Sequence, residues 1–162
     1  LFNLLDSHDT KRLRSDVKNL DEYFAQIAVL FAMPGSPCIY YGTEIAMEGS
    51  YDPDCRRCMP WDEIDSAENQ KKIELMKSLI RMRIQEDACR SLYFDFPHKY
   101  SQKRCVEYRK LNLDGKWIEV LLNCGSEPIE IQGQGEILFA RRCEGNSLDV
   151  RGTLIRRLPS TV

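Results

Sequence analysis

The sequence has no apolar run near the roughly 20 residues that a membrane-spanning helix needs. It also has no basic segment leading into an apolar core at its start, so no export signal is expected. Neither sign of charge dominates, because 23 basic and 25 acidic residues give a formal net charge of -2. That balance argues against nucleic acid or an anionic membrane as a partner. We expect a soluble, cytoplasmic protein.

A disulfide framework is absent as well. The seven cysteines are odd in number and lack the short regular spacing of disulfide-rich domains, so a reducing compartment is the simplest setting. There is no initiating methionine, and the chain opens on Leu1 inside an apolar run, so we expect a fragment of a longer protein. The 162 residues that are present, 43% of them hydrophobic, suit one ordinary domain or two small ones.

A cluster of polar side chains follows the first apolar run. Residues 1–5 are mostly apolar, and the segment Ser7–Thr10 then places His8 beside Asp9. This pattern predicts a buried strand that ends in a polar rim, where barrels of parallel strands carry their reactive side chains. A carboxylate beside an imidazole suits the orientation of hydroxyl groups, although a turn or a helix cap explains the same residues equally well. Residues 11–19 are charged and predicted to be irregular.

The next segments predict a strand–helix–strand unit. Apolar residues at spacings of three and four indicate an amphipathic helix over Leu20–Met33, which Pro34 and Gly35 end. The β-prone run Cys38–Tyr41 then predicts a second, parallel strand that again leads into polar residues. Such a unit cannot cover its own sheet, so we expect it to belong to a larger α/β layer whose other strands lie upstream.

Residues 45–66 form a long segment rich in turn-forming residues, and its length favours a functional loop. A second helix is predicted over Ala67–Glu86, with Ser66 as its N-cap. We place a domain boundary between Asp87 and Leu92, which divides the chain into residues 1–88 and 89–162. The predicted apolar face of the second helix consists of Ile73, Met76, Ile80 and Ile84.

The last part of the chain has the pattern of an antiparallel β-domain. Short β-prone runs recur at intervals of about ten residues, which is typical of a sandwich. Asp114-Gly115 is the strongest hairpin signal. The predicted strands are Val106–Leu111, Trp117–Asn123, Ile129–Ile131, Glu136–Ala140 and Ser147–Arg157.

Four segments resemble the α-amylase family of glycoside hydrolases, and most closely its cyclomaltodextrinase, neopullulanase and maltogenic amylase branch. They occur in the family's order and at suitable distances. The segments are Phe2-Asn-Leu-Leu-Asp-Ser-His-Asp-Thr-Lys-Arg12, Pro37-Cys-Ile-Tyr-Tyr-Gly-Thr-Glu-Ile45, Met47-Glu-Gly49, and Asp52-Pro-Asp-Cys-Arg-Arg57 with Met59-Pro-Trp-Asp62.

The resemblance implies a fold in which the last two strands and helices of a (β/α)8 barrel precede an all-β antiparallel sandwich. It also implies site residues. Asp9 corresponds to the third catalytic carboxylate of the family, which holds sugar hydroxyls and distorts the ring. His8, Asp52 and Arg56 correspond to substrate-binding residues, and an arginine paired with a carboxylate is suited to gripping hydroxyl groups.

The implied activity is hydrolysis, with retention, of α-1,4 glucosidic bonds in maltodextrins, cyclodextrins or pullulan, with α-1,6 bonds as a further candidate. The family's nucleophilic Asp and acid/base Glu lie on earlier strands that this chain does not contain, so we expect the chain alone to be inactive. An α-glucan oligosaccharide is the expected partner. We also expect the barrel remnant to expose apolar faces through which the chain self-associates.

Three positions depart from the family's pattern: Asp6 replaces a small residue, Thr43 an acidic residue and Ala46 a glycine. These departures bear on the local geometry of the loops.

Two alternatives stay open beside the glycosidase. One is a carbohydrate-binding or interaction β-domain, although Tyr108, Trp117 and Phe139 are expected to point inward. The other is a zinc or redox module on Cys55 and Cys58, although no second cysteine pair follows and the arginines between them would repel a cation. We predict no cofactor and no metal site, and the sequence carries no readable signal for calcium binding by the parent.

Overall fold

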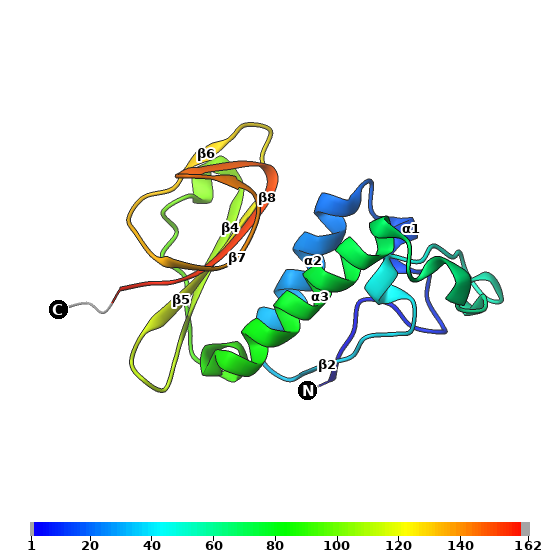
Figure 1. The fold of residues 1–162 in the computed structure, drawn as a ribbon. Helices are drawn as coiled ribbons and strands as arrows, with labels where there is room; N and C mark the ends of the chain where they lie inside the picture. The colour runs from blue at the N-terminus through cyan, green and yellow to red at the C-terminus, as the bar shows by residue number, and fades with distance from the viewer. Residues whose placement is uncertain (1, 160–162) are drawn as a thin grey trace.

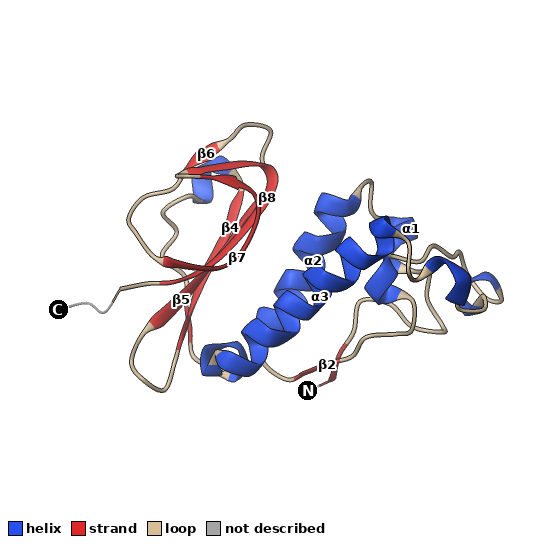
Figure 2. Ribbon diagram, in the orientation of Figure 1, coloured by secondary structure: helices blue, strands red, loops and turns tan. Residues whose placement is uncertain are grey.

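The computed structural model describes residues 2–159 (Figure 1). Leu1, with which the first apolar run begins, lies outside the described residues. Two long helices, α2 (Leu20–Ala32) and α3 (Ala67–Gln85), lie side by side, and a curled sheet built from the second half of the chain packs beside them (Figures 1 and 2). The short elements before the sheet are β1 (Phe2–Asn3), α1 (Leu13–Asp16), β2 (Ser36–Pro37) and the 3₁₀ helices η1 (Thr43–Ile45), η2 (Asp54–Arg56), η3 (Trp61–Glu63) and η4 (Asp87–Arg90).

The predicted strand–helix–strand order is confirmed, but the first strand is not buried as predicted, because Phe2 is 67% exposed and Leu4 just beyond it is 44% exposed. β1 and β2 pair in parallel, and α2 connects them. Asn19 begins α2, because its side-chain oxygen accepts hydrogen bonds from the backbone N–H groups of Asp21 and Glu22, both at 3.0 Å. The observed helix ends one residue before the predicted end.

The second strand was predicted in the wrong place, because residues 38–41 are not a strand. The backbone N–H of Cys38 adds one hydrogen bond to the ladder, to the carbonyl of Asn3 at 2.7 Å, and the chain then turns at Gly42, whose φ is 81°. Within residues 2–159 the pair has no further strand beside it, so nothing extends the ladder. Residues 11–19 are also more regular than predicted, since they contain α1.

The second predicted helix is confirmed with its cap, because the Ser66 hydroxyl accepts a hydrogen bond from Asn69 N at 3.3 Å. The predicted apolar face is wrong in two positions: Ile80 is 39% exposed and Ile84 is 68% exposed. The face that α3 buries against α2 therefore differs from the predicted face. The buried apolar residues of α3 are Met76, Leu79 and Met82.

The observed orientation of α3 places Arg83 at the C-terminal end of α2. Its guanidinium donates to the carbonyls of Phe31 at 2.7 Å and Met33 at 2.8 Å. From the sheet side, the fully buried Lys110 donates to the carbonyls of Ala32 and Cys89, both at 3.1 Å. Both cations therefore satisfy carbonyls where the helix dipole is negative, and they tie α3 and the sheet to α2.

All five predicted strands are present, and their antiparallel pairing is confirmed. They form one hydrogen-bonded network in the order β3-β4-β5-β8-β6, with β7 also paired to β8. The Asp114-Gly115 hairpin joins β4 to β5, with Gly115 at φ 82°. The prediction missed the short β3, η5 (Ser101–Lys103) and the far end of β7. The strands are β3 (Phe94–Asp95), β4 (Cys105–Leu111), β5 (Trp117–Asn123), β6 (Ile129–Glu130), β7 (Glu136–Glu144) and β8 (Ser147–Arg157).

One hydrophobic core joins the helices to the sheet. Phe24, Ile27 and Phe31 of α2 belong to the same buried cluster as Tyr108 of β4 and Val120 of β5. A second, smaller cluster fills the inside of the curled sheet. No helix within residues 2–159 has both the length and the apolar character needed to cross a membrane.

Burial lowers the pKa of Lys110 to about 8. The pKa of a lysine in the unfolded chain is about 10.4. At pH values between these two pKa values, Lys110 has lost its proton in the folded state but still holds it in the unfolded state. This group's contribution to the free energy of unfolding therefore rises with pH over that window, by about 1.4 kcal/mol per pH unit.

We expect the free energy of unfolding of the unmodified chain to rise relative to that of Lys110→Met between pH 8 and pH 10.5. Urea titrations of both proteins at four pH values measure the difference. A difference that stays flat across the window would show that Lys110 keeps its proton in the folded state.

Candidate functional site

The four predicted site residues lie together in the structure. Asp9 follows β1, and Arg56 belongs to η2, 47 residues later, yet Arg56 Nη2 lies 3.2 Å from Asp9 Oδ1. Arg56 Nε lies 2.8 Å from Asp52 Oδ1, and His8 Nε2 lies 3.1 Å from Asp9 Oδ2. The side chains form a row in the order Asp52, Arg56, Asp9 and His8, in which the guanidinium lies between two carboxylates, and all four are largely exposed.

The backbone of His8 fixes the two segments against each other. Its carbonyl accepts a hydrogen bond from Arg56 Nε at 3.1 Å and another from the Cys55 thiol at 3.1 Å. Cys55 is fully buried, so its side chain lies beneath the charged row while Arg56 faces solvent. An exposed row of donors and acceptors, held from below, is suited to a ligand with several neighbouring hydroxyl groups.

Arg12 is the residue of this region that the sequence did not single out. It is fully buried, and its guanidinium donates to the carbonyls of Tyr41 at 2.6 Å and Cys55 at 2.9 Å. An arginine is usually expected at the surface, so no composition or spacing signal marks it. In the sequence it is only the last residue of the first motif.

Two of the departures from the family's pattern hydrogen-bond to each other. Asp6 is buried, and its carboxylate accepts from Thr43 Oγ1 at 3.0 Å and from the backbone N–H of Leu13 at 3.0 Å. The carbonyl of Thr43 in turn accepts from the Tyr23 hydroxyl of α2 at 2.6 Å. Burial raises the pKa of that hydroxyl above its usual value, so Tyr23 stays a hydrogen-bond donor. This network connects α2 to the loops that carry the site.

The third departure places an alanine in a left-handed conformation. Ala46 ends η1 with φ 57° and ψ 47°, a conformation that costs a residue with a Cβ more than it costs glycine. The region therefore carries local backbone strain beside the site.

The loop after η1 has its own ion pairs. Asp54 accepts from Ser50 N at 2.6 Å and from Arg57 Nε at 2.6 Å, and these two contacts, the backbone hydrogen bond first, hold the pKa of its carboxyl below the usual value. Asp54 is therefore occupied within the loop, whereas Asp52 faces Arg56. The exposed Trp61 and Cys58 lie further along the same loop.

The geometry gives little support to the zinc or redox alternative. Cys55 is buried with its thiol on the His8 carbonyl, while Cys58 is exposed. Within residues 2–159 no group of three or more histidine, cysteine or acidic side chains is arranged to hold a metal ion.

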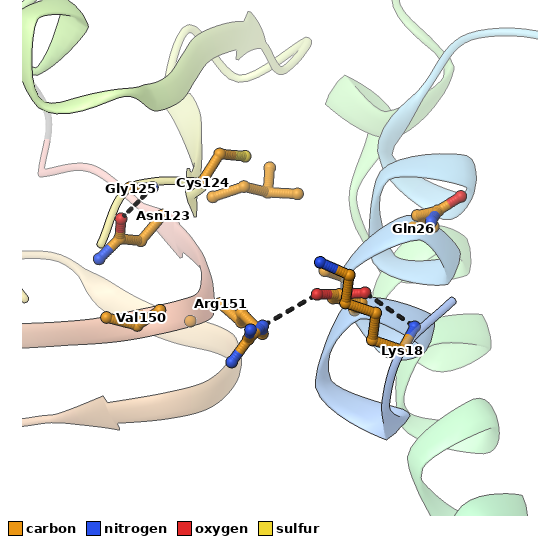
Figure 3. A pocket seen from close by; sticks show the side chains of 11 residues that line it. Lys18, Gln26, Asn123, Cys124, Gly125, Val150 and Arg151 are labelled. Atoms are coloured by element: carbon orange, nitrogen blue, oxygen red, sulfur yellow. Dashed lines mark hydrogen bonds and ion pairs between the residues drawn. The ribbon is translucent and has the colours of Figure 1, made fainter. Parts of the chain in front are cut away.

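A pocket of about 430 Å³ lies elsewhere, where the start of α2 faces the sheet (Figure 3). The ion pair between Arg151 and Glu22, at 2.9 Å, bridges its two sides. Lys18 and Gln26 line the helix side, and Cys124 lines the sheet side. None of the predicted site residues lines this pocket.

Comparisons with known proteins agree with the motifs. The family model "Alpha amylase, catalytic domain" matches residues 1–110. The intracellular maltogenic amylase of Bacillus subtilis is 53% identical over 89 residues, which are 54% of this chain and 15% of that protein. A cyclomaltodextrinase of Thermoanaerobacter pseudethanolicus is 34% identical over 146 residues, which are 90% of this chain and 23% of that protein.

A solved structure gives the same result for the fold. The maltogenic amylase from S. marinus superposes with a TM-score of 0.76 at 32% identity, over 99% of this chain and 23% of that one. The chain spans 15 to 23% of the length of these relatives.

The Asp6 network leads to a stability prediction. We expect Asp6→Ala to lower the free energy of unfolding by about 1 to 3 kcal/mol, because it leaves the buried Leu13 N–H without an acceptor. Thr43→Val should cost less, and the double variant should cost about 1 kcal/mol less than the sum of the two single changes. Urea unfolding of the four proteins measures this cycle, and additive effects would show that the two side chains are not coupled.

Proposed function

This chain belongs to the α-amylase family, and on that premise we propose that it is the C-terminal part of a retaining glycosidase that hydrolyses α-1,4 glucosidic bonds. The observation that carries the proposal is the row of Asp52, Arg56, Asp9 and His8, built from two segments more than 40 residues apart. Maltodextrins, cyclodextrins and pullulan are the proposed substrates, with α-1,6 bonds as a further target. The names of the similar proteins, maltogenic amylase, cyclomaltodextrinase and neopullulanase, support this class.

The proposed roles follow from the chemistry of each side chain. Neighbouring hydroxyls of a glucose unit each carry a donor and an acceptor, and the row offers carboxylate acceptors on both sides of a guanidinium donor. Asp9 is the proposed catalytic residue, because its carboxylate can hold sugar hydroxyls and stabilise positive charge that develops on the ring. His8, Asp52 and Arg56 are proposed to bind the same sugar.

Bond cleavage needs two further carboxyl groups. A retaining glycosidase uses a nucleophile and an acid/base residue roughly 5 Å apart, and a single stabilising carboxylate replaces neither. We propose that residues of the parent protein outside this chain supply both, on strands that extend the β1–β2 pair.

The proposed domain organisation places residues 1–88 in the barrel and residues 89–162 in a β-sandwich domain. Its support is the end of α3 at Gln85 and the start of the sheet at Phe94. Phe2 and Ile84, both more than 60% exposed, lie on the proposed barrel part and are proposed to mediate self-association of the isolated chain. We propose a cytoplasmic location, which the seven free cysteines and the word "intracellular" in one relative's name support.

Replacement of Asp9 by Asn in the parent protein should lower kcat by about 100-fold or more, because the amide cannot stabilise developing positive charge as a carboxylate does. The matched control is Asp16→Asn, an exposed carboxylate near Lys11 on the surface. Steady-state kinetics on maltotriose, with circular dichroism to verify the fold, measure the effect. Near-normal turnover by Asp9→Asn would contradict the catalytic role proposed for Asp9.

The isolated chain should not release the chromophore from a chromogenic maltoside. The reason is the missing pair of carboxyl groups, and the measurement is hydrolysis by rigorously purified chain at high concentration. Robust hydrolysis that follows the chain through purification would show that the chain holds a complete catalytic set.

A further inference from the structure

Arg12 is a buried cation without a buried anion. Its side chain is 0% exposed, and no carboxylate within residues 2–159 pairs with it. The guanidinium lies against two neighbouring aromatic rings, 4.1 Å from the ring centre of Tyr40 and 4.5 Å from that of Tyr41. It donates to the carbonyls of Tyr41 and Cys55 and contacts the sulfur of Met47 at 3.8 Å. Burial of an unpaired charge is costly, so a different gain must account for it.

That gain is a connection between three segments. Arg12 itself follows the Ser7–Thr10 segment, Tyr41 follows β2, and Cys55 belongs to the loop with the substrate-binding residues. The planar guanidinium can donate to two separate carbonyls while it lies against two rings, and a lysine ammonium lacks this forked geometry. The backbone N–H of Arg12 adds a further hydrogen bond, to the carbonyl of Gly49 at 2.9 Å.

The loop is shaped to close on this side chain. A Cβ at Gly49 would lie 3.0 Å from Arg12 Cγ, 2.8 Å from the Asp54 carbonyl and 3.1 Å from Cys55 Cα. Only glycine therefore allows the loop to pack so closely on the arginine stem.

The contact chain leads directly to the charged row. Arg12 holds the carbonyl of Cys55, the Cys55 thiol donates to the carbonyl of His8, and the next residue, Arg56, bridges Asp52 and Asp9. We propose that Arg12 is a positioning residue, which clamps residues 49–57 so that Arg56 and Asp52 meet Asp9 on one sugar unit. The claim that these residues meet on one sugar unit rests on the proposed function, whereas the claim that Arg12 holds the loop in place does not.

Cysteine labelling on the chain itself tests the clamp. Cys55 is buried in the clamped loop, Cys89 is buried in the core between helices and sheet, and Cys58 is exposed. In Arg12→Met, alkylation by iodoacetamide, followed residue by residue with mass spectrometry, should become about tenfold or more faster at Cys55 and stay unchanged at Cys89. The matched control is Arg81→Met, which removes an exposed arginine of α3.

Two outcomes would overturn the clamp. An unchanged rate at Cys55 would show that the loop closes without the guanidinium. Equal acceleration at Cys55 and Cys89 would show that Arg12 supports the whole fold rather than this loop.

Chemical rescue separates the guanidinium from charge alone. In Arg12→Ala, millimolar methylguanidinium should slow Cys55 alkylation toward the rate of the unmodified chain, and methylammonium at equal concentration should not. Rescue by neither, or equal rescue by both, would contradict the two-carbonyl, two-ring geometry.

Kinetics of the parent protein test the claim that the clamped loop positions residues for sugar binding. Arg12→Met should raise KM for maltotriose by about tenfold, with a smaller loss in kcat than Asp9→Asn causes, because the loop residues bind sugar and Asp9 stabilises charge. Loop opening without any change in KM would refute the positioning role. Full activity of Asp9→Asn, by contrast, would refute the proposed function and leave the labelling result standing.

Discussion

The burial of α2 is the constraint on which the rest of the structure depends. At its N-terminal end, Asp21 pairs with Arg141 at 2.7 Å and Glu22 pairs with Arg151 at 2.9 Å, so acidic side chains lie where the helix dipole is positive and also hold the sheet. At its C-terminal end, buried cations satisfy the last carbonyls. Both halves of the chain are thereby fastened to one helix, and Tyr23 of that helix reaches the loops below the charged row.

The charged row depends on this framework although it is exposed. Ion pairs between solvent-exposed side chains contribute little to stability, so the pairs of Arg56 with Asp9 and Asp52 cannot bring their two segments together. The buried contacts below do so: the Cys55 thiol on the His8 carbonyl, the Asp6 network and the Arg12 guanidinium. The surface is thus left open for a ligand while its geometry is set from the interior.

Elements with a strong local signal could be predicted from the sequence, and those set by long-range contacts could not. Periodicity predicted both α2 and α3, Ser66 predicted the start of α3, and alternation with Asp114-Gly115 predicted the β4–β5 hairpin. The Asn19 cap was not predicted. The apolar face of α3 was misplaced because Leu79 and Met82, and not Ile80 and Ile84, pack into the core, on the face that also carries the buried Arg83.

The same distinction holds for the site. The resemblance to the family implied Asp9, His8, Asp52 and Arg56 as site residues, and the structure brings their side chains together. Arg12 could not be identified, because its burial depends on rings and carbonyls supplied by residues 40–55. The pairing of Asp6 with Thr43 was equally invisible as two separate departures from a pattern.

The most direct test of the central claim is a crystal structure of the parent protein with an uncleavable maltooligosaccharide bound. The account predicts the Asp9 carboxylate and the Arg56 guanidinium within hydrogen-bonding distance of the same glucose unit, with Asp52 against a neighbouring hydroxyl. A sugar bound elsewhere, with these three side chains facing only water, would contradict it.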